Sequence, residues 1–569
     1  MRSAGLSPAA RADALAGFAS ADLDVLVVGG GVVGAGAAMD AATRGLRTGI
    51  VEAQDWASGT SSRSSKLIHG GLRYLEMLDF GLVRESLHER SLLLNRIAPH
   101  LVHPVPFLYP LRHRVWERSY VGAGVVLYDG LAATARERQR MPRHRHLTRR
   151  GALAQAPCLR SDKLAGAVQY WDAQVDDARF TMALVRTAAS YGALAANRCR
   201  VTEFTRSGDA VTGARLLDVD TGQTIDVRAR QVINATGVWT GDLPVPGPRA
   251  DTLRVRASKG VHLVVPRERL RSATGIITRT ERSVLFVIPW RRHWIIGTTD
   301  TDWNLSKDHP AASAQDVDYL LDHVNSILSE PLSRDDVVGV YAGLRPLLAG
   351  AADTTAKLSR EHTVSRVAPG LVVVAGGKFT TYRVMAAEAV DEAASELGRP
   401  VPPSCTDRLP LTGASGFLAL WNRRHELAAE HRIDPAHLEH LLNRYGDTVD
   451  QVLELAQSES ALAQPLPGTQ DYLRAEAVYA VTHEGARHLD DVLARRTRLS
   501  IGAWDRGTAA APVVAELIAP HLGWGESDVA RELRHYRAQV AAELQSQDEP
   551  DDQAAEAAQL RALETALSA

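Results

Sequence analysis

The sequence predicts an α/β fold that is followed by a separate all-α domain. Strand-like runs at residues 23–28, 231–235 and 371–375 each lead into a glycine-containing turn, and a helical pattern follows the first and third turns. Beyond the prolines of residues 400–403, residues 416–536 are helical in pattern with few β-branched runs. A chain of 569 residues is long enough for about three or four domains.

The composition is that of a globular protein, with 45% hydrophobic and 23% charged residues. Lys and Arg number 65 against 67 Asp and Glu, so the chain lacks the basic field that nucleic acid binding requires. Cys158, Cys199 and Cys405 form no C-x-x-C pair, which fits a reducing compartment. No stretch approaches roughly eighteen consecutive apolar residues, and the N-terminus lacks the apolar core of a secretory signal. We therefore expect an intracellular protein without a membrane-spanning helix.

Residues 23–52 read as strand, helix and strand around a G-x-G-x-x-G motif formed by Gly29, Gly31 and Gly34. Glycines at these positions permit a tight turn and let backbone N–H groups approach a pyrophosphate at the helix N-terminus. Glu52 ends the second strand 18 residues after Gly34, where its carboxylate can accept a hydrogen bond from a ribose 2′-hydroxyl. The acidic residue favours FAD or NAD over NADP.

Two later turns favour FAD over NAD. Residues 234–239 follow a strand, and residues 375–380 form another strand-to-helix turn near the end of the α/β part. In many two-domain flavoproteins an extended FAD is held in this way, and a late helix N-terminus stabilises negative charge on the reduced flavin. The alternative is that both stretches are ordinary turns.

The predicted organisation is a Rossmann-like FAD-binding domain with an interleaved β-rich substrate or cap domain, plus a C-terminal all-α domain. Residues 104–150 carry many prolines and arginines and are expected to form a loop or cap. The expected divisions are a flexible N-terminal arm at 1–21, the FAD-binding domain at 22–100, 176–260 and 351–400, a cap or loop region at 101–175, a β-rich substrate-binding domain at 261–350, a helical domain at 401–545, and a tail at 546–569 that is either a solvated helix or disordered.

A series of long motifs, in this order, closely resembles the FAD-dependent, membrane-associated glycerol-3-phosphate dehydrogenases. The motifs are residues 29–36, 52–55, 60–75, 175–179, 234–237, 286–290, 296–300, 343–346 and 376–383. The resemblance covers about residues 22–383, and the helical C-terminal region fits the extra domain of that family. It implies oxidation of sn-glycerol 3-phosphate to dihydroxyacetone phosphate in glycerol metabolism, with electrons passed from FADH₂ to a membrane quinone.

The substrate residues follow from the chemistry and from the resemblance. A phosphate dianion requires cations, and guanidinium groups match its oxygens. The resemblance assigns substrate binding to Arg73, Tyr74, Arg345, Arg360 and Lys378, of which Lys378 is also positioned to stabilise an alkoxide. Arg345 and Lys378 are therefore candidate catalytic residues as well.

The reaction also needs a base for the hydroxyl proton, and histidine is the usual residue near neutral pH. His69 lies in the motif of residues 60–75, and His262 follows Lys259, where the family also carries a histidine. The sequence does not rank these two histidines. A lone strand histidine such as His262 is otherwise more often a core residue.

The residues expected to bind FAD are mostly glycines and small hydroxyl side chains, with one cation to face the pyrophosphate. They are Gly29, Gly31, Gly34, Glu52, Thr60, Ser61, Ser64, Ser65, Lys66, Ile68, His69, Thr236, Gly237, Gly376, Gly377 and Thr380. Arg63 has no assigned role and is expected to be solvated, as is the basic run of residues 495–498. We expect no metal site, because His483 and His488 are five residues apart and would face away from each other on a helix.

Three alternatives stay open from the sequence. The same chemistry could use O₂, as in a glycerol-3-phosphate oxidase, or an amine-oxidising or amino-acid-oxidising flavoenzyme could share the fold. A non-catalytic flavin-binding or RNA-interacting module is disfavoured by the neutral charge and the complete set of polar site residues.

Quinone reduction requires contact with the bilayer, so the resemblance implies a peripheral protein on the cytoplasmic, inner face of the cell membrane. Residues 112–128 mix cations, aromatic residues and aliphatic residues as an interfacial segment does. A cap over the active site is an equal alternative for this segment. A homodimer is one expectation for the oligomeric state.

Overall fold

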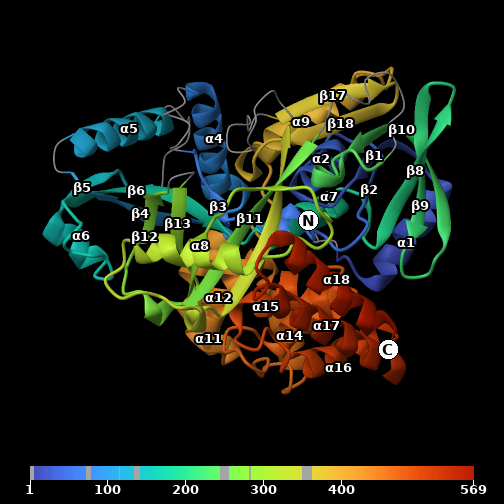
Figure 1. Cartoon of the computed structure of the whole chain (residues 1–569). Coiled ribbons are helices and arrows are strands. Elements are labelled where there is room, and N and C mark those ends of the chain that lie inside the picture. Colours follow the sequence, from blue (N-terminus) through green and yellow to red (C-terminus); the bar gives the residue numbers. More distant parts are fainter. Residues whose placement is uncertain are drawn as a thin grey trace.

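The computed structural model describes residues 5–71, 79–113, 116–133, 141–243, 255–280, 284–348 and 362–568. An α/β body built on two sheets packs against a helical C-terminal domain, coloured orange to red in Figure 1. The predicted α/β fold with an appended all-α domain is therefore confirmed. None of the helices in the described residues is long and apolar enough to cross a membrane.

The first sheet has a parallel centre in which strand β1 lies between β10 and β2, and it continues to β18 on one side and β7 on the other. Strand β17 and the hairpin β8–β9 add antiparallel neighbours. The bounds are β1 (Asp22–Val28), β2 (Thr48–Val51), β7 (Leu194–Ala196), β8 (Cys199–Ser207), β9 (Ala210–Asp218), β10 (Thr224–Asn234), β17 (His362–Ala368) and β18 (Leu371–Gly376).

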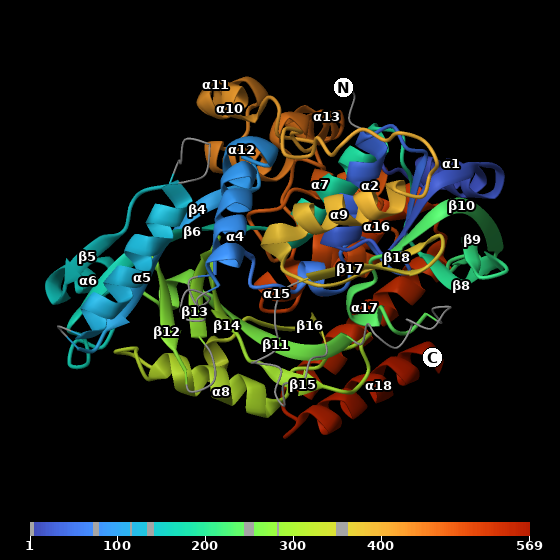
Figure 2. The same ribbon diagram turned by 90° about the horizontal axis from the view of Figure 1, so that it is seen from above.

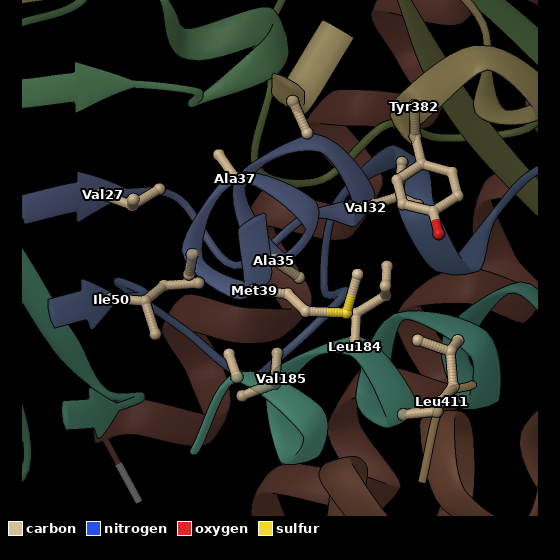
Figure 3. Packing of buried hydrophobic residues seen from close by; sticks show 14 of the residues in the cluster. Val27, Val32, Ala35, Ala37, Met39, Ile50, Leu184, Val185, Tyr382 and Leu411 are labelled. Atoms are coloured by element: carbon tan, nitrogen blue, oxygen red, sulfur yellow. The ribbon is translucent and has the colours of Figure 1, made fainter. Parts of the chain in front are cut away.

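Helices α2 (Val32–Thr43), α7 (Asp177–Ser190) and α9 (Tyr382–Ala394) pack together against one face of this sheet. Figure 3 shows Val27 and Ile50 from the strands facing Met39 and Leu184 from two of the helices. Parallel strands that are buried on both faces read as continuous apolar runs, which explains why the strand signals were strong in the sequence.

The second sheet follows the order β15-β11-β14-β13-β12-β4-β6-β3, with β16 paired to β11 and β5 paired to β6. Its bounds are β3 (Leu67–Ile68), β4 (Val102–Leu111), β5 (Arg145–Thr148), β6 (Gly166–Val175), β11 (Val255–Pro266), β12 (Gly275–Arg279), β13 (Val284–Trp290), β14 (His293–Gly297), β15 (Thr301–Trp303) and β16 (Gly339–Leu348). Around it lie α4 (Phe80–Leu92), α5 (Trp116–Ala133), α6 (Arg149–Gln155) and α8 (Ala314–Asn325) (Figures 1 and 2).

The expectation of a loop at residues 104–150 needs correction, because the described part of this stretch holds most of β4, all of α5 and β5, and part of α6. Pro104, Pro106 and Pro110 are separated by even numbers of residues, so their missing N–H groups fall on one edge of β4. The strand pairs with β6 along its whole length. Prolines that share one edge are thus compatible with a strand, although they weaken its sequence signal.

The N-terminal arm is also not flexible where it is described. Helix α1 (Pro8–Ser20) is capped by Ser7, whose hydroxyl accepts from the Ala10 N–H. Phe18 is fully buried, and a Cβ on Gly49 of β2 would lie 2.5 Å from its ring. Phe18 therefore packs helix α1 against β2, in a segment that was expected to be a flexible arm.

The C-terminal domain contains α10 (Phe417–Asn422), α11 (Arg424–His431), α12 (Pro435–Tyr445), α13 (Val449–Ser458), α14 (Arg474–Thr482), a π-helical turn η10 (Asp491–Arg496), α15 (Leu499–Gly502), α16 (Ala511–Leu522), α17 (Glu526–Ser546) and α18 (Asp552–Ser568). The tail, expected to be a solvated helix or disordered, is helix α18, and it packs on α17 with Ala555 buried. Asp552 also pairs with the fully buried Lys259 of β11. The C-terminal helix is thereby fixed to the second sheet.

Candidate active site

A cavity of about 560 Å³ lies between the carboxyl ends of β1, β10 and β18 and the β11–β16 pair of the second sheet. Ligands of open α/β sheets bind at the carboxyl ends of their strands. Most of the site residues predicted from the sequence line this cavity: Gly29, Gly31, Glu52, Thr60, Ser61, Ser64, Ser65, His69, Thr236, Gly237, His262, Arg345, Gly376, Gly377, Lys378 and Thr380.

One end of the cavity is the glycine turn that enters α2. Gly29 has a φ of +110°, and a Cβ on Gly34 would lie 2.0 Å from the Gly29 carbonyl oxygen. Gly34 does not line the cavity, but its lack of a side chain allows the glycine turn to close. The Val32 N–H at the helix start donates to Ser61 Oγ over 2.9 Å. This arrangement leaves a helix N-terminus open to an anionic group.

Glu52 is held beside this turn by backbone donors. Its carboxylate accepts from the Gly30 N–H at 2.6 Å and the Gln54 N–H at 2.8 Å. Burial raises the pKa of Glu52 above its usual value, while the two backbone hydrogen bonds oppose the rise. The side chain is fixed where the sequence predicted contact with a ribose.

The opposite wall of the cavity is the segment Thr60–Ile68, which crosses strand β16. Thr60 Oγ1 donates to the Leu344 carbonyl, and Tyr341 Oη donates to the Ser64 carbonyl at 3.0 Å. A Cβ on Gly343 would lie 2.5 Å from the Arg63 carbonyl oxygen. Only glycine allows the segment to approach the sheet this closely.

The structure corrects the prediction for Lys66 and Ile68, which do not line the cavity. Lys66 is fully buried and donates to Asp177 at 2.8 Å and to the Ser62 carbonyl at 3.1 Å. Burial, together with the nearby Arg498, lowers the pKa of Lys66 to about 8, although Asp177 opposes the change. Ile68 is buried in the core below the first sheet. The cation that the sequence assigned to a pyrophosphate is instead used within the protein.

Two predictions of solvated arginines are also wrong. Arg63 lines the cavity, and burial lowers its pKa below the usual value. Arg495 and Arg496 both pair with the buried Asp55, and the Arg498 side chain is only 3% exposed. A basic run looks solvated in a sequence when its acidic partners are hundreds of residues away.

His262 is held at the cavity by two neighbours. Its Nε2 lies 2.8 Å from Ser65 Oγ, and its ring stacks on Tyr341 with centroids 4.8 Å apart. Burial lowers the pKa of His262 well below its usual value, and the positive charges of Arg345 and Lys66 lower it further. The imidazole is therefore neutral at ordinary pH. A Cβ on Gly297 would lie 2.3 Å from this ring, so the neighbouring strand leaves the space that the ring occupies.

Arg345 lies two residues along β16 from Gly343, on the same face as Tyr341. Its guanidinium donates to Thr298 Oγ1 at 2.9 Å and to the Thr299 carbonyl at 3.1 Å. A longer contact of 3.4 Å joins it to Asp300. The group thus borders the cavity in a fixed orientation while its side chain remains 20% exposed.

The third wall is formed by the turn into α9. Gly376 and Gly377 have φ values of +76° and +82°. Thr380 Oγ1 accepts from the His69 backbone N–H at 3.2 Å, which joins this turn to the segment Thr60–Ile68. Lys378 lines the cavity at the same turn. Predicted site residues from three distant parts of the sequence therefore meet at one cavity.

Arg73, Tyr74 and Arg360 lie outside the described residues. Sequence reasoning missed Asp177 and Tyr341 as parts of the site. Asp177 lies within the motif of residues 175–179, and Tyr341 lies two residues before the motif of residues 343–346. The type and the position of these two residues gave no reason to assign either of them to the site.

Comparison with known proteins identifies the fold and the family. Residues 24–392 match the family described as FAD dependent oxidoreductase, and residues 404–529 match the C-terminal domain of alpha-glycerophosphate oxidase. Glycerol-3-phosphate dehydrogenase 2 of Mycobacterium tuberculosis (strain ATCC 25618 / H37Rv) is 52% identical over 553 residues, which cover 97% of this chain and 94% of that protein. The chain belongs to the FAD-dependent glycerol-3-phosphate dehydrogenase family.

Another relative and two solved structures are also similar to this chain. The mitochondrial enzyme of Homo sapiens is 36% identical over 542 residues, covering 91% of this chain and 73% of that protein. The Bacillus halodurans enzyme complexed with FAD superposes with a TM-score of 0.76 and 28% identity, covering 94% of this chain and 98% of that chain. L-alpha-glycerophosphate oxidase of Mycoplasma pneumoniae, at 17% identity and a TM-score of 0.51, covers 69% of this chain and 99% of its own, and shares the fold.

The cofactor of the family is FAD, and the residues of this chain fit it. The open helix N-terminus at Gly31, the fixed carboxylate of Glu52 and the glycine turn before α9 lie along one cavity. These features match the pyrophosphate, the ribose and the flavin end of a dinucleotide.

Proposed function

We propose that this flavoenzyme oxidises sn-glycerol 3-phosphate to dihydroxyacetone phosphate and passes the electrons to a membrane quinone. The observation that carries the proposal is that His262, Arg345 and Lys378 border the same cavity as the dinucleotide-binding turns. The substrate requires a base for its C2 hydroxyl and cations for its phosphate and for a developing alkoxide, and this cavity offers both.

Bound FAD supplies the acceptor for the hydride that leaves C2. We propose His262 as the group that takes the hydroxyl proton, because its neutral ring is held in one orientation by Ser65 and Tyr341. The positive charges around it disfavour a protonated ring, but a bound phosphate dianion adds compensating negative charge. Substrate binding would thus raise the proton affinity of the base. His69 lines the same cavity and is the alternative base.

The remaining roles follow from charge and position. Arg345 is proposed to bind the phosphate or its surroundings, with Arg73, Tyr74 and Arg360 assigned to the substrate by sequence resemblance. Lys378 is proposed to stabilise negative charge on the C2 oxygen. Ser61, Ser64, Ser65, Thr236 and Gly237 are proposed to contact FAD along the cavity wall.

The test is anaerobic addition of substrate to the purified, FAD-loaded protein. Glycerol 3-phosphate should bleach the flavin absorbance with one equivalent of dihydroxyacetone phosphate formed, while glycerol and amino acids should leave it unchanged. Bleaching by amino acids instead would support an amine-oxidising enzyme. If no substrate bleaches the flavin, the proposal is wrong.

O₂ is the alternative electron acceptor to quinone, because residues 404–529 match a domain described for an oxidase. After anaerobic reduction, the flavin should be reoxidised faster by a quinone analogue than by air-saturated buffer. Stoichiometric hydrogen peroxide and faster reoxidation by O₂ would identify an oxidase.

For the quinone route we propose that α5 rests on the lipid surface of the inner face of the cell membrane. Its buried side carries Val121, Val125 and Tyr128, yet Trp116 and Tyr120 on its outer side are 62% and 52% exposed. Helices α5 and α4 lie together at one end of the molecule (Figure 1), and Phe80 of α4 is also exposed. Exposed aromatic residues on one helix are typical of interfacial segments.

The membrane proposal is tested by sedimentation with anionic phospholipid vesicles. The double substitution Trp116→Ser and Tyr120→Ser should abolish co-sedimentation. Trp504→Ser is the matched control, because Trp504 is 64% exposed in the helical domain. Equal binding of both variants would contradict a role for α5.

A further inference from the structure

The Arg498 side chain of the helical domain contacts the wall of the active-site cavity. Arg498 follows the π-helical turn η10, and its side chain is buried between the two parts of the protein. Its φ of +64° lies in the left-handed region, which non-glycine residues adopt rarely. Such a conformation persists where surrounding contacts fix it.

Apart from one hydrogen bond to the Ala494 carbonyl, the hydrogen bonds of the Arg498 guanidinium reach the α/β body. The guanidinium donates to Asp176 at 2.8 Å, to Asp177, and to the Ser62 carbonyl at 3.1 Å. Asp176 and Asp177 stand at the start of α7. A single arginine from the end of the chain thus bridges α7 and the segment Thr60–Ile68.

Asp177 connects Arg498 to the segment Thr60–Ile68, which forms one wall of the cavity. Its fully buried carboxylate accepts from the Ser64 N–H at 3.0 Å, Ser64 Oγ at 2.7 Å and Lys66 Nζ at 2.8 Å. Three donors from Ser64 and Lys66 therefore share a carboxylate to which Arg498 also donates. Networks of this kind in a low-dielectric interior are rigid when every member is satisfied.

The segment held by Asp177 contacts His262, the proposed base. Ser65, between Ser64 and Lys66, places its hydroxyl 2.8 Å from His262 Nε2. Tyr341, whose ring stacks on His262, donates to the Ser64 carbonyl. The position of the imidazole is therefore connected to Arg498 through Asp177, Ser64 and Ser65.

We propose that Arg498 is a positioning residue of the active site, through which the helical domain holds the Ser64–Lys66 segment against His262. The inference rests on the proposed role of His262 and assigns a function to the helical domain. Arg498 touches neither cavity nor reacting atoms, so its effect is on the orientation of the groups that do.

A second buried arginine distinguishes positioning from simple attachment of the domains. Arg179, on the same helix α7, pairs with Glu484 of the helical domain at 2.6 Å, and both side chains are buried. It also donates to the Arg444 carbonyl, so both of these partners lie in the helical domain and neither lies in the segment Thr60–Ile68. Arg179→Gln therefore removes a comparable bridge without touching the cavity wall.

The experiment compares Arg498→Gln with Arg179→Gln in the FAD-loaded protein. Flavin content, Tm, the apparent Kd for glycerol 3-phosphate and the limiting rate of anaerobic flavin reduction are measured. Arg498→Gln should lower the limiting rate at least tenfold with flavin retained, and Arg498→Lys should restore part of it. Arg179→Gln should lower Tm similarly but leave the rate within twofold of the wild type.

A structural readout accompanies the rates. Hydrogen exchange at the Ser64 and Lys66 amides of the substrate-free holoenzyme should become faster in Arg498→Gln and stay unchanged in Arg179→Gln. Ser64→Ala should also lower the limiting rate, and the double variant Ser64→Ala with Arg498→Gln should be less than additive. If Arg498→Gln yields no folded protein, Ser64→Ala and Arg498→Lys decide by the same rates.

The outcomes separate this inference from the proposed function. A wild-type rate and unchanged exchange in Arg498→Gln, or equal loss of rate in both arginine variants, would overturn the positioning role alone. Failure of the wild-type flavin to be reduced by glycerol 3-phosphate would overturn the proposed function and this inference with it.

Discussion

His262 and Tyr341 face each other across the β11–β16 pair, with their rings 4.8 Å apart and inclined by 9°. The tyrosine fixes the plane of the imidazole, and its hydroxyl also holds the segment that carries Ser65. One cross-strand pair therefore connects the sheet, the cavity wall and the proposed base.

His262→Gln should lower the limiting rate of flavin reduction by about 10²–10⁴-fold, the usual contribution of a general base. The amide fills a similar volume but takes no proton at neutral pH, so flavin content should stay normal. Stopped-flow absorbance under anaerobic conditions measures the rate. His69→Gln should have the smaller effect, and the reverse ranking would assign the base to His69.

Arg345→Lys should raise KM for glycerol 3-phosphate by about 10-fold to 100-fold, since charged hydrogen bonds contribute roughly 1.5–3 kcal/mol. A lysine keeps the charge but not the planar set of donors. Steady-state kinetics with a quinone analogue measure the change. Arg215→Lys, at a half-exposed side chain of β9 that does not line the cavity, should leave KM unaltered, and an unchanged KM for Arg345→Lys would argue against phosphate binding.

Gly343→Ala should destabilise the protein by about 1–3 kcal/mol, because its Cβ would approach the Arg63 carbonyl oxygen to 2.5 Å. Displacement of the segment Thr60–Ile68 should also weaken FAD binding. Thermal unfolding and flavin content report these two effects. Gly124→Ala in α5 is the control, since nothing lies within 4 Å of that Cβ and alanine favours a helix. A Tm for Gly343→Ala equal to that of the wild type would contradict the close approach.

We expect the free energy of unfolding to depend on pH through the protonation of His488. Burial alone would lower its pKa, but hydrogen bonds to Asp220 and Glu532 raise the pKa of His488 from 6.5 to about 9. The resulting stabilisation is fully present below about pH 6.5 and is lost as pH rises through about 9, as linkage requires. With a side chain that is 30% exposed, it amounts to about 1–2 kcal/mol.

The check is urea unfolding of the wild type and His488→Gln between these pH values. The two free energies of unfolding should differ most at low pH and converge above about pH 9. A difference that is constant with pH would show that folding leaves the pKa of His488 unchanged and would contradict this prediction.

The parts of the site that are local in the sequence were predictable, and the parts that depend on long-range pairing were not. Gly29, Gly31, Gly34 and Glu52 form one βαβ unit whose spacing alone indicates a dinucleotide. The hydrogen bond from Arg498 to the Ser62 carbonyl joins residues 436 positions apart in the sequence, and no local sequence pattern predicts it.

Lys66 shows why residue type does not determine role. It stands among hydroxyl residues that line the cavity, yet its side chain is buried against Asp177, and its backbone has a φ of +56°. Similarly, the N-terminal segment forms helix α1, in which Phe18 is fully buried. Both outcomes depend on partners that the sequence brings close only in the folded chain.

The central claim is that a hydride leaves C2 of glycerol 3-phosphate for the bound flavin. Its most direct test is the anaerobic rate of flavin reduction with substrate deuterated at C2, compared with substrate deuterated at C1. Deuterium at C2 should slow the reduction and deuterium at C1 should leave it unchanged. Equal rates with the two substrates, or no reduction with either, would contradict the account.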